Sequence, residues 1–95
     1  MSRFLIEVPH DSDRVACNRA IEVFLRTGSH FLSRADWGCK DGEHKAWLIV
    51  DVETRDEARN TVPPEFRANA RIIQLVGFTW DDIDPSGKKR ARNAE

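Results

Sequence analysis

The sequence lacks long apolar runs, has few cysteines and carries no excess of charge of either sign. No apolar stretch approaches the ~20 residues that span a bilayer, so we expect no membrane segment. The opening stretch MSRFLIEVPH is interrupted by Glu7 and Pro9, and we do not expect it to act as a signal peptide. Two cysteines are too few for a disulfide scaffold, and they favour a cytoplasmic protein with free thiols.

The charges are balanced. Fifteen basic and 16 acidic residues give a net charge of −1, so we expect neither nucleic acid nor anionic lipid as a partner. A composition of 40% apolar and 33% charged residues is typical of a globular chain, and 95 residues suffice for one domain. We expect that domain over residues 1–80 and a flexible polar tail over 81–95. The basic cluster KKRAR in the tail is interpreted as solvated, with contact to an acidic partner as the alternative.

Hydrophobic patterning predicts six elements in the order strand, helix, strand, strand, helix, strand. RFLIEV is a strand that stops at Pro9, and a helix capped by Asp11 or Ser12 follows it. Two strands, at about 31–39 and 44–52, flank Asp41-Gly42, a two-residue hairpin signal. A second helix opens in TRDEARNTV, and the last strand is ARIIQLVGFT. This order predicts an α+β fold of the ferredoxin-like βαββαβ type. We expect a four-stranded antiparallel sheet with its first and third strands in the middle and both helices on one face.

A two-residue turn at Asp41-Gly42 determines which residues share a face of the sheet. It pairs Asp36 with Trp47, and each strand then alternates between two faces. The helix face is predicted to carry Phe4, Ile6, Val8, Ala35, Trp37, Ala46, Leu48, Val50, Val52, Ile73 and Leu75. The opposite face, which mixes apolar and charged residues, is predicted to carry Leu5, Glu7, Arg34, Asp36, Lys45, Trp47, Ile49, Asp51, Ile72, Gln74 and Val76. Five large apolar residues on an uncovered face predict a partner, and a second copy is the simplest one.

The segments IEVPHD and GEHKAWLIVDVETRDEARNTVPPEF resemble corresponding stretches of muconolactone isomerases, and the element order resembles the dimeric α+β barrel group to which those belong. The resemblance covers about a third of the chain. It implies a homodimer in which two sheets face each other and enclose ligand pockets. Related small enzymes of the wider group include monooxygenases. His10, in PHD, is the one residue whose catalytic role the resemblance implies.

The mixed face holds the charged groups that we expect to line such a pocket. We predict Glu7 and Asp36, with His10 at the end of the first strand, as catalytic acid–base groups, since a carboxylate beside an aromatic ring has a raised pKa. The predicted ligand-binding residues are Arg34, Trp47, Asp51 and Gln74. Two alternatives stay open: Arg34 and Asp36 fix the dimer by pairing with the partner subunit, and His10 is an ordinary loop residue.

A metal site is the less favoured interpretation, and we expect no metal and no cofactor. Cys39 and His44 are candidate ligands across the hairpin, with His10 or Asp41 as a third. Structural zinc, however, usually takes four ligands in recognisable pairs, and neither CxxC nor HxxxH occurs here. A Cys17–Cys39 disulfide is likewise less favoured than two free thiols.

The predicted function is a homodimeric small-molecule-binding protein, and an isomerase or oxygenase of small organic acids or aromatics is the activity that we expect of it. The alternative is a non-catalytic regulatory or interaction module that binds a partner through the sheet face. An RNA-binding domain of this fold would need a basic sheet with exposed aromatics, whereas Trp47 stands among acids.

Overall fold

The computed structural model describes residues 1–27 and 30–87. Its elements in chain order are β1 (Ser2–Pro9), α1 (Arg14–Thr27), η1 (Leu32–Arg34), β2 (Asp36–Trp37), η2 (Cys39–Asp41), β3 (Lys45–Val52), α2 (Arg55–Asn60), α3 (Pro64–Arg67), β4 (Arg71–Leu75) and α4 (Trp80–Ile83). The strands form one sheet in the order β2-β3-β1-β4, and each neighbouring pair is antiparallel. The predicted α+β class with a four-stranded antiparallel sheet is therefore confirmed. None of the helices described is long and apolar enough to cross a membrane.

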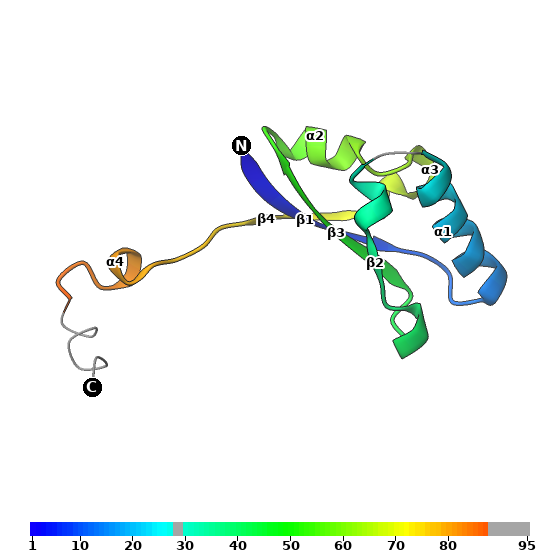
Figure 1. The fold of residues 1–95 in the computed structure, drawn as a ribbon, viewed down its shortest axis with the longest axis horizontal. Coiled ribbons are helices and arrows are strands. Elements are labelled where there is room, and N and C mark those ends of the chain that lie inside the picture. The colour runs from blue at the N-terminus through cyan, green and yellow to red at the C-terminus, as the bar shows by residue number, and fades with distance from the viewer. Residues whose placement is uncertain (28–29, 88–95) are drawn as a thin grey trace.

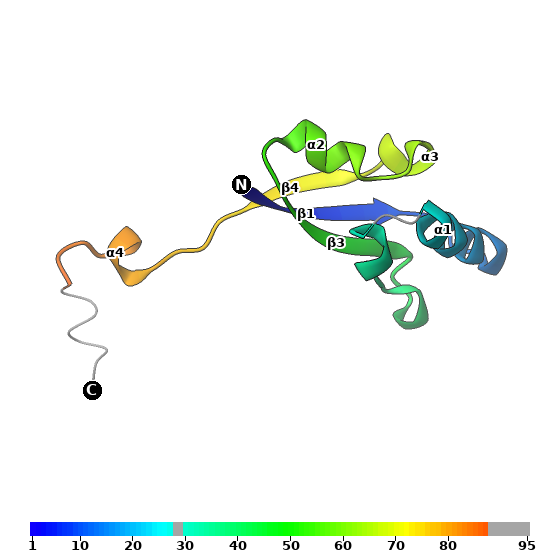
Figure 2. The same ribbon diagram turned by 45° about the horizontal axis from the view of Figure 1, so that its top comes forward.

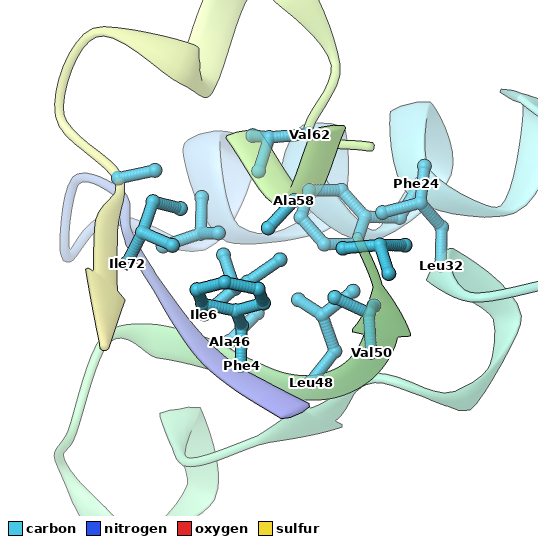
Figure 3. Close-up of a cluster of buried hydrophobic side chains, with 13 residues drawn as sticks. Phe4, Ile6, Phe24, Leu32, Ala46, Leu48, Val50, Ala58, Val62 and Ile72 are labelled. Atoms are coloured by element: carbon cyan, nitrogen blue, oxygen red, sulfur yellow. The ribbon is translucent and has the colours of Figure 1, made fainter. Parts of the chain in front are cut away.

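One face of the sheet carries the hydrophobic core. Residues of β1 alternate between buried and less buried positions, as expected for a strand with one covered face. In Figure 2, α2 and α3 lie over this face, and Phe24 of α1 reaches the same core as Ala58 of α2. Figure 3 shows these side chains gathered above β1 and β3. The core comprises Phe4, Ile6, Val8, Phe24, Leu32, Ala46, Leu48, Val50, Val52, Ala58, Val62, Ala70 and Ile72.

Two side chains cap the N-termini of α1 and α2. The Asp13 carboxylate accepts a hydrogen bond from the Ala16 amide at 2.8 Å, so Asp13 caps α1, and not Asp11 or Ser12 as predicted. Thr54 caps α2 by accepting a hydrogen bond from the Glu57 amide at 3.1 Å, as the spacing of these residues predicted. The Asp13 cap places Cys17 in the first turns of α1, where its side chain is buried.

The segment before β3 differs from the predicted hairpin. The pairing of Asp36 with Trp47 is confirmed, but β2 has only two residues, and a short 3-10 helix replaces the start of the predicted strand. The two-residue turn is wrong, because strand pairing ends at Gly38, whose amide donates to the Lys45 carbonyl. The chain then enters η2 and leaves it through Gly42, whose φ of 84° suits glycine. A loop over residues 38–44, not a tight turn, therefore joins β2 to β3.

The two faces of β4 are the reverse of those predicted. Ile72 pairs with Ile6 and is buried in the core, whereas Ile73 pairs with Leu5 on the opposite face. Gln74, predicted to bind ligand on the mixed face, lies opposite Phe4 and donates to the Ser2 hydroxyl at 3.4 Å. The run Ile72-Ile73 is apolar in either phase, so its pattern does not determine the face. Pairing with β1 decides it.

The chain beyond β4 leaves the sheet. Figure 1 shows it running away from the body to α4, which begins at Trp80 and so spans the predicted boundary between domain and tail. The Thr79 hydroxyl and the Asp82 carboxylate form a capping box at its start. The basic cluster at 88–92 lies outside the described residues. With the projecting segment, the molecule measures 55 × 30 × 20 Å.

Candidate metal centre

Four side chains from separate segments converge at the end of β1. His10 follows β1, Cys17 lies in α1, Cys39 opens η2 and His44 immediately precedes β3. One ligand atom from each of them, a thiol sulfur or a ring nitrogen, lies within 4.8 Å of all the others. In Figure 1 this is the end of the sheet nearest α1 and the loop after β2. Two thiols and two imidazoles are a complete set of structural zinc ligands.

The backbone brings these ligands together. The register of β1 on β3 pairs Pro9 with Lys45, and the His10 amide donates to the His44 carbonyl at 3.0 Å. This bond continues the ladder by one step and places the two histidines side by side. The capped start of α1 brings Cys17 back over them. A loop bond from the Gly42 amide to the Cys39 carbonyl, at 3.2 Å, closes η2 on the other side.

The separations between ligand atoms suit one tetrahedral ion. Zn–S bonds of about 2.3 Å and Zn–N bonds of about 2.0 Å at tetrahedral angles place ligand atoms roughly 3.3–3.8 Å apart. His10 Nε2 lies 3.0 Å from Cys17 Sγ and 3.1 Å from Cys39 Sγ. Cys17 Sγ lies 3.9 Å from His44 Nδ1. The observed distances bracket those expected, so shifts of less than 1 Å would bring these atoms to bonding positions.

Burial sets the protonation of these groups in the metal-free protein. Desolvation is the main cause that raises the pKa of Cys39 to about 11, and the hydrogen bond and charge of Cys17 raise it further. A backbone hydrogen bond lowers this pKa by a smaller amount. Burial lowers the pKa of His10, the neighbouring His44 lowers it further, and Asp11 opposes both. Without a metal, both shifts favour the neutral forms of the Cys39 thiol and the His10 imidazole. Nδ1 of His10 is buried and has no hydrogen-bond partner among the described residues.

Aromatic packing supports one side of the cluster, and two hollows flank it. The Trp37 ring lies edge-on to the His10 ring at 5.7 Å, and Phe24 packs on Trp37 at 4.9 Å. A hollow of about 340 Å³ is lined by Cys17, Cys39 and His44 together with Arg14 and Lys40, among others. A second hollow, of about 260 Å³, reaches His10 from the side of α3. An ion can thus enter from solvent to a cluster in which Cys17 is buried and the other three residues are half-buried.

Gly38 is needed for the path of the loop. A Cβ atom at this position would lie 2.7 Å from the Glu43 carbonyl oxygen and 2.7 Å from the Trp47 ring. The first of these contacts is to backbone, which cannot rotate away. Any larger residue would therefore displace the loop that carries Cys39 and His44.

The predicted acid–base groups do not form one site. His10 belongs to the cluster of thiols and imidazoles, whereas Glu7 and Asp36 lie on the uncovered sheet face in one row with Trp47 between them. Glu7 accepts hydrogen bonds from the Trp47 indole at 3.2 Å and from Arg71 at 3.4 Å. The Glu7 carboxylate thus bridges Trp47 of β3 and Arg71 of β4 across the sheet.

The predicted binding residues are divided as well. Arg34 and Asp36 line a hollow of about 240 Å³ on the uncovered face, together with Trp47, Leu5 and Ile49. Asp51 faces Arg3 at 4.0 Å, with both side chains exposed. With Gln74 on the other side of the sheet, the predicted ligand-binding set is only partly brought together.

Cys17 is the ligand that sequence reasoning missed. Cys39, His44 and His10 were weighed as a metal set, but Cys17 was considered only as a disulfide partner. A signal was present: Cys17, Ala20 and Phe24 are spaced to share the buried face of α1. A cysteine on the core face near the start of a helix that directly follows His10 is a candidate neighbour of that histidine, although the packing of α1 decides whether the two side chains meet.

Comparison with models of known protein families, with curated proteins and with solved structures finds no match for this chain.

Proposed function

We propose that this chain is a zinc-binding α+β domain, and that His10, Cys17, Cys39 and His44 hold one ion. The observation that carries the proposal is the convergence of all four ligand atoms within 4.8 Å. Thiolates with imidazoles in tetrahedral geometry select zinc over harder ions such as Mg²⁺ or Ca²⁺. Free thiolates persist in a reducing compartment, so the proposal includes the cytoplasmic location that the sequence favours.

The proposed role of the ion is structural. Four protein ligands fill a tetrahedral shell, whereas catalytic zinc keeps one position for water or substrate. The ion would join the end of β1, the start of α1 and the loop after β2. On the loop side the regular structure is short, since β2 has two residues and η2 three. Metal binding contributes directly to folding in small domains of this kind.

Elemental analysis of untagged protein tests the proposal. We expect about one zinc per chain in the wild type, and a large loss in Cys17→Ser and Cys39→Ser. His30→Asn is the matched control, because His30 is the one histidine of the chain's three that is not in the cluster, and its side chain is exposed. Substitution with Co²⁺ should also produce thiolate-to-metal absorption that the cysteine variants lose. Wild-type protein that retains no zinc after reconstitution would overturn the proposal.

A second candidate function is a small-molecule site on the uncovered sheet face. The central position of β1 and β3, with helices on the other face, supports the finer assignment to the ferredoxin-like arrangement and to the dimeric α+β barrels that the sequence resembles. The hollow beside Arg34, Asp36 and Trp47 supports a ligand that is aromatic and acidic. Such a site would serve an isomerase or oxygenase of small aromatic acids, and the alternative without catalysis is an interaction module.

Benzoate is a suitable probe, because its ring can pack on Trp47 and its carboxylate can pair with Arg34. We expect a saturable change in tryptophan fluorescence that Arg34→Gln weakens. Arg14→Gln is the control, since Arg14 lines the hollow beside the metal cluster instead. A linear, unsaturated response into the millimolar range would exclude this candidate without affecting the zinc proposal.

A further inference from the structure

The sheet face opposite the helices is apolar at its centre and uncovered in the single chain. Ile49 is 54% exposed, and its neighbours on this face are half-buried. Pairing across β1, β3 and β4 places Leu5, Trp47, Ile49, Ile73 and Leu75 on this face. Charged residues of both signs surround them. A contiguous apolar surface with a polar rim is typical of a docking site.

The segment at residues 76–83, here called the arm, is a second uncovered apolar surface. Val76, Phe78, Trp80 and Ile83 are 69%, 74%, 41% and 58% exposed. A Cβ atom added at Gly77 would meet nothing within 4 Å, so no other part of the described chain packs on this point. Four large apolar residues in eight positions are more than a solvated linker needs.

The arm has a defined local structure that it cannot maintain alone. A helix of four residues is far below the length at which isolated helices become stable in water. Thr79 and Asp82 nevertheless form a capping box that starts α4 at a definite residue. Local signals thus specify the shape of the arm, while the packing that would stabilise it is missing from the single chain.

We propose that the arm of one copy packs on the uncovered sheet face of a second copy, so that two chains form a symmetric dimer by exchanging arms. Figure 2 shows α4 beyond the end of the sheet, away from α2 and α3, so the arm lies clear of the rest of its own chain. This exchange of arms would cover the arm and the sheet face of both chains. Two-fold exchange of an identical element is a common route to a dimer.

The area available is of the size that a dimer needs. Aromatic side chains contribute roughly 150–250 Å² each when buried. The exposed parts of the arm and of the face therefore supply several hundred Å² per chain. Stable complexes bury about 800 Å² per partner, so arm and face together approach that value, whereas either surface alone falls short of it.

Charge complementarity favours the same arrangement. The first turn of α4 carries Asp81 and Asp82, and the rim of the sheet face carries Arg3, Arg34 and Arg71. Arg34 has no carboxylate within 4.0 Å in the part of the chain that is described. The same face also carries Glu7, Asp36 and Asp51, and Arg3 and Arg71 already face Asp51 and Glu7. Arg34 is therefore the rim arginine that would attract an acidic helix start, over a Debye length of about 8 Å at physiological salt.

The direction of the arm argues against docking on its own sheet. The last pair of the β1–β4 ladder is Arg3 with Leu75, so the arm begins where the sheet ends. From there it continues away from the body in both views (Figures 1 and 2). Reaching its own Ile49 would require the chain to reverse its direction after Leu75.

Light scattering and sedimentation of the zinc-loaded full chain test the proposal. We expect twice the 10.9 kDa chain mass for the wild type. Phe78→Glu on the arm and Ile49→Glu on the face should each weaken dimerisation by at least tenfold, because each buries a charge in the interface. Leu25→Glu is the matched control: Leu25 is 61% exposed on α1, away from both surfaces, and its substitution should leave the mass unchanged.

Isotope-filtered NMR on mixed labelled and unlabelled chains shows whether the arm on the sheet face comes from the same chain or from the other one. We expect contacts between Phe78 of one chain and Ile49 of the other. A wild type that is monomeric at tens of micromolar, a dimer that survives Phe78→Glu, or arm contacts only within one chain would each overturn the proposal. The four zinc ligands lie at the other end of β1, so zinc content should be unaltered in both interface variants. Loss of the dimer and loss of the metal are therefore separate outcomes.

Discussion

The two ends of β1 are completed in different ways. At its C-terminal end, His10 meets Cys17, Cys39 and His44, and polar ligand atoms point at a common centre. At its N-terminal end, β4 ends beside Arg3 and the chain continues as an apolar arm with large exposed side chains and open space around Gly77. We propose that the first end binds an ion and that the second binds another protein surface, so the two ends differ in the kind of component that would complete them.

The difference shows which variables control each end. The ligand cluster should respond to free zinc, to thiol oxidation and to pH, and it should be independent of protein concentration. The arm should respond to protein concentration and hardly at all to chelators. The shared core of Phe4, Ile6 and Val8 joins the two ends through one strand. Perturbing one end while observing the other is therefore the most direct way to test the comparison.

Removal of zinc should have the largest effect. At free zinc one thousand times Kd, binding to the folded state alone contributes about 4.1 kcal/mol. For a domain of this size that corresponds to a loss of about 15–30 °C in Tm after chelation. Thermal melts of zinc-loaded and chelator-treated protein at equal concentration measure it. Cys17→Ser should melt like the chelated wild type and show no further response to chelator. Equal melting temperatures with and without zinc would contradict a structural role.

Gly38→Ala should have the next largest effect, and it should be confined to the metal end. The added methyl group meets the Glu43 carbonyl and displaces the loop that carries two ligands. We expect zinc affinity to fall by ~10–100-fold, as for loss of a group that orients metal ligands. Gly77→Ala is the matched control, because open space surrounds Gly77. Competition with a chromophoric chelator measures both variants, and unchanged affinity in Gly38→Ala would show that the loop adapts.

The sequence predicts the covered parts of this molecule better than its ends. Alternation along β1 and β3 correctly assigns Ile6 and Leu48 to the core, because one face of each strand is uniformly apolar. It fails for β4, where adjacent isoleucines suit either face. The candidate site shows the same limit. His10, Cys39 and His44 were recognised as metal-binding types, but the position of Cys17 depends on how α1 packs, which no spacing in the chain reveals.

Alkaline pH should distinguish the metal-free protein from the loaded one by a smaller effect. Burial raises the pKa of Cys39 from 9.0 to about 11 in the metal-free fold. The unfolded chain then loses this proton first, so the stability that the neutral thiol contributes is complete below pH 9 and is lost as pH rises toward about 11. Zinc-loaded protein already holds a thiolate and should lack this slope. Melts across this range, with metal-free Cys39→Ser to subtract other groups, measure the difference. Equal slopes in all three samples would contradict it.

Asp36→Asn should have the smallest effect, and it tests whether the edge strand β2 contributes to the metal cluster or to the dimer interface. Asp36 is exposed in β2 and forms no ion pair with Arg34 in the described structure. Removing an exposed, unpaired charge should change the free energy of unfolding by less than about 0.5 kcal/mol. Zinc content should also be unaltered, because Asp36 lies outside the ligand cluster. Denaturant unfolding at two protein concentrations measures the effect, with Asp56→Asn at an exposed position of α2 as the control. A loss that appears only at the higher concentration, where dimers predominate, would place Asp36 in the interface. A loss at both concentrations would show that its carboxylate stabilises the single chain.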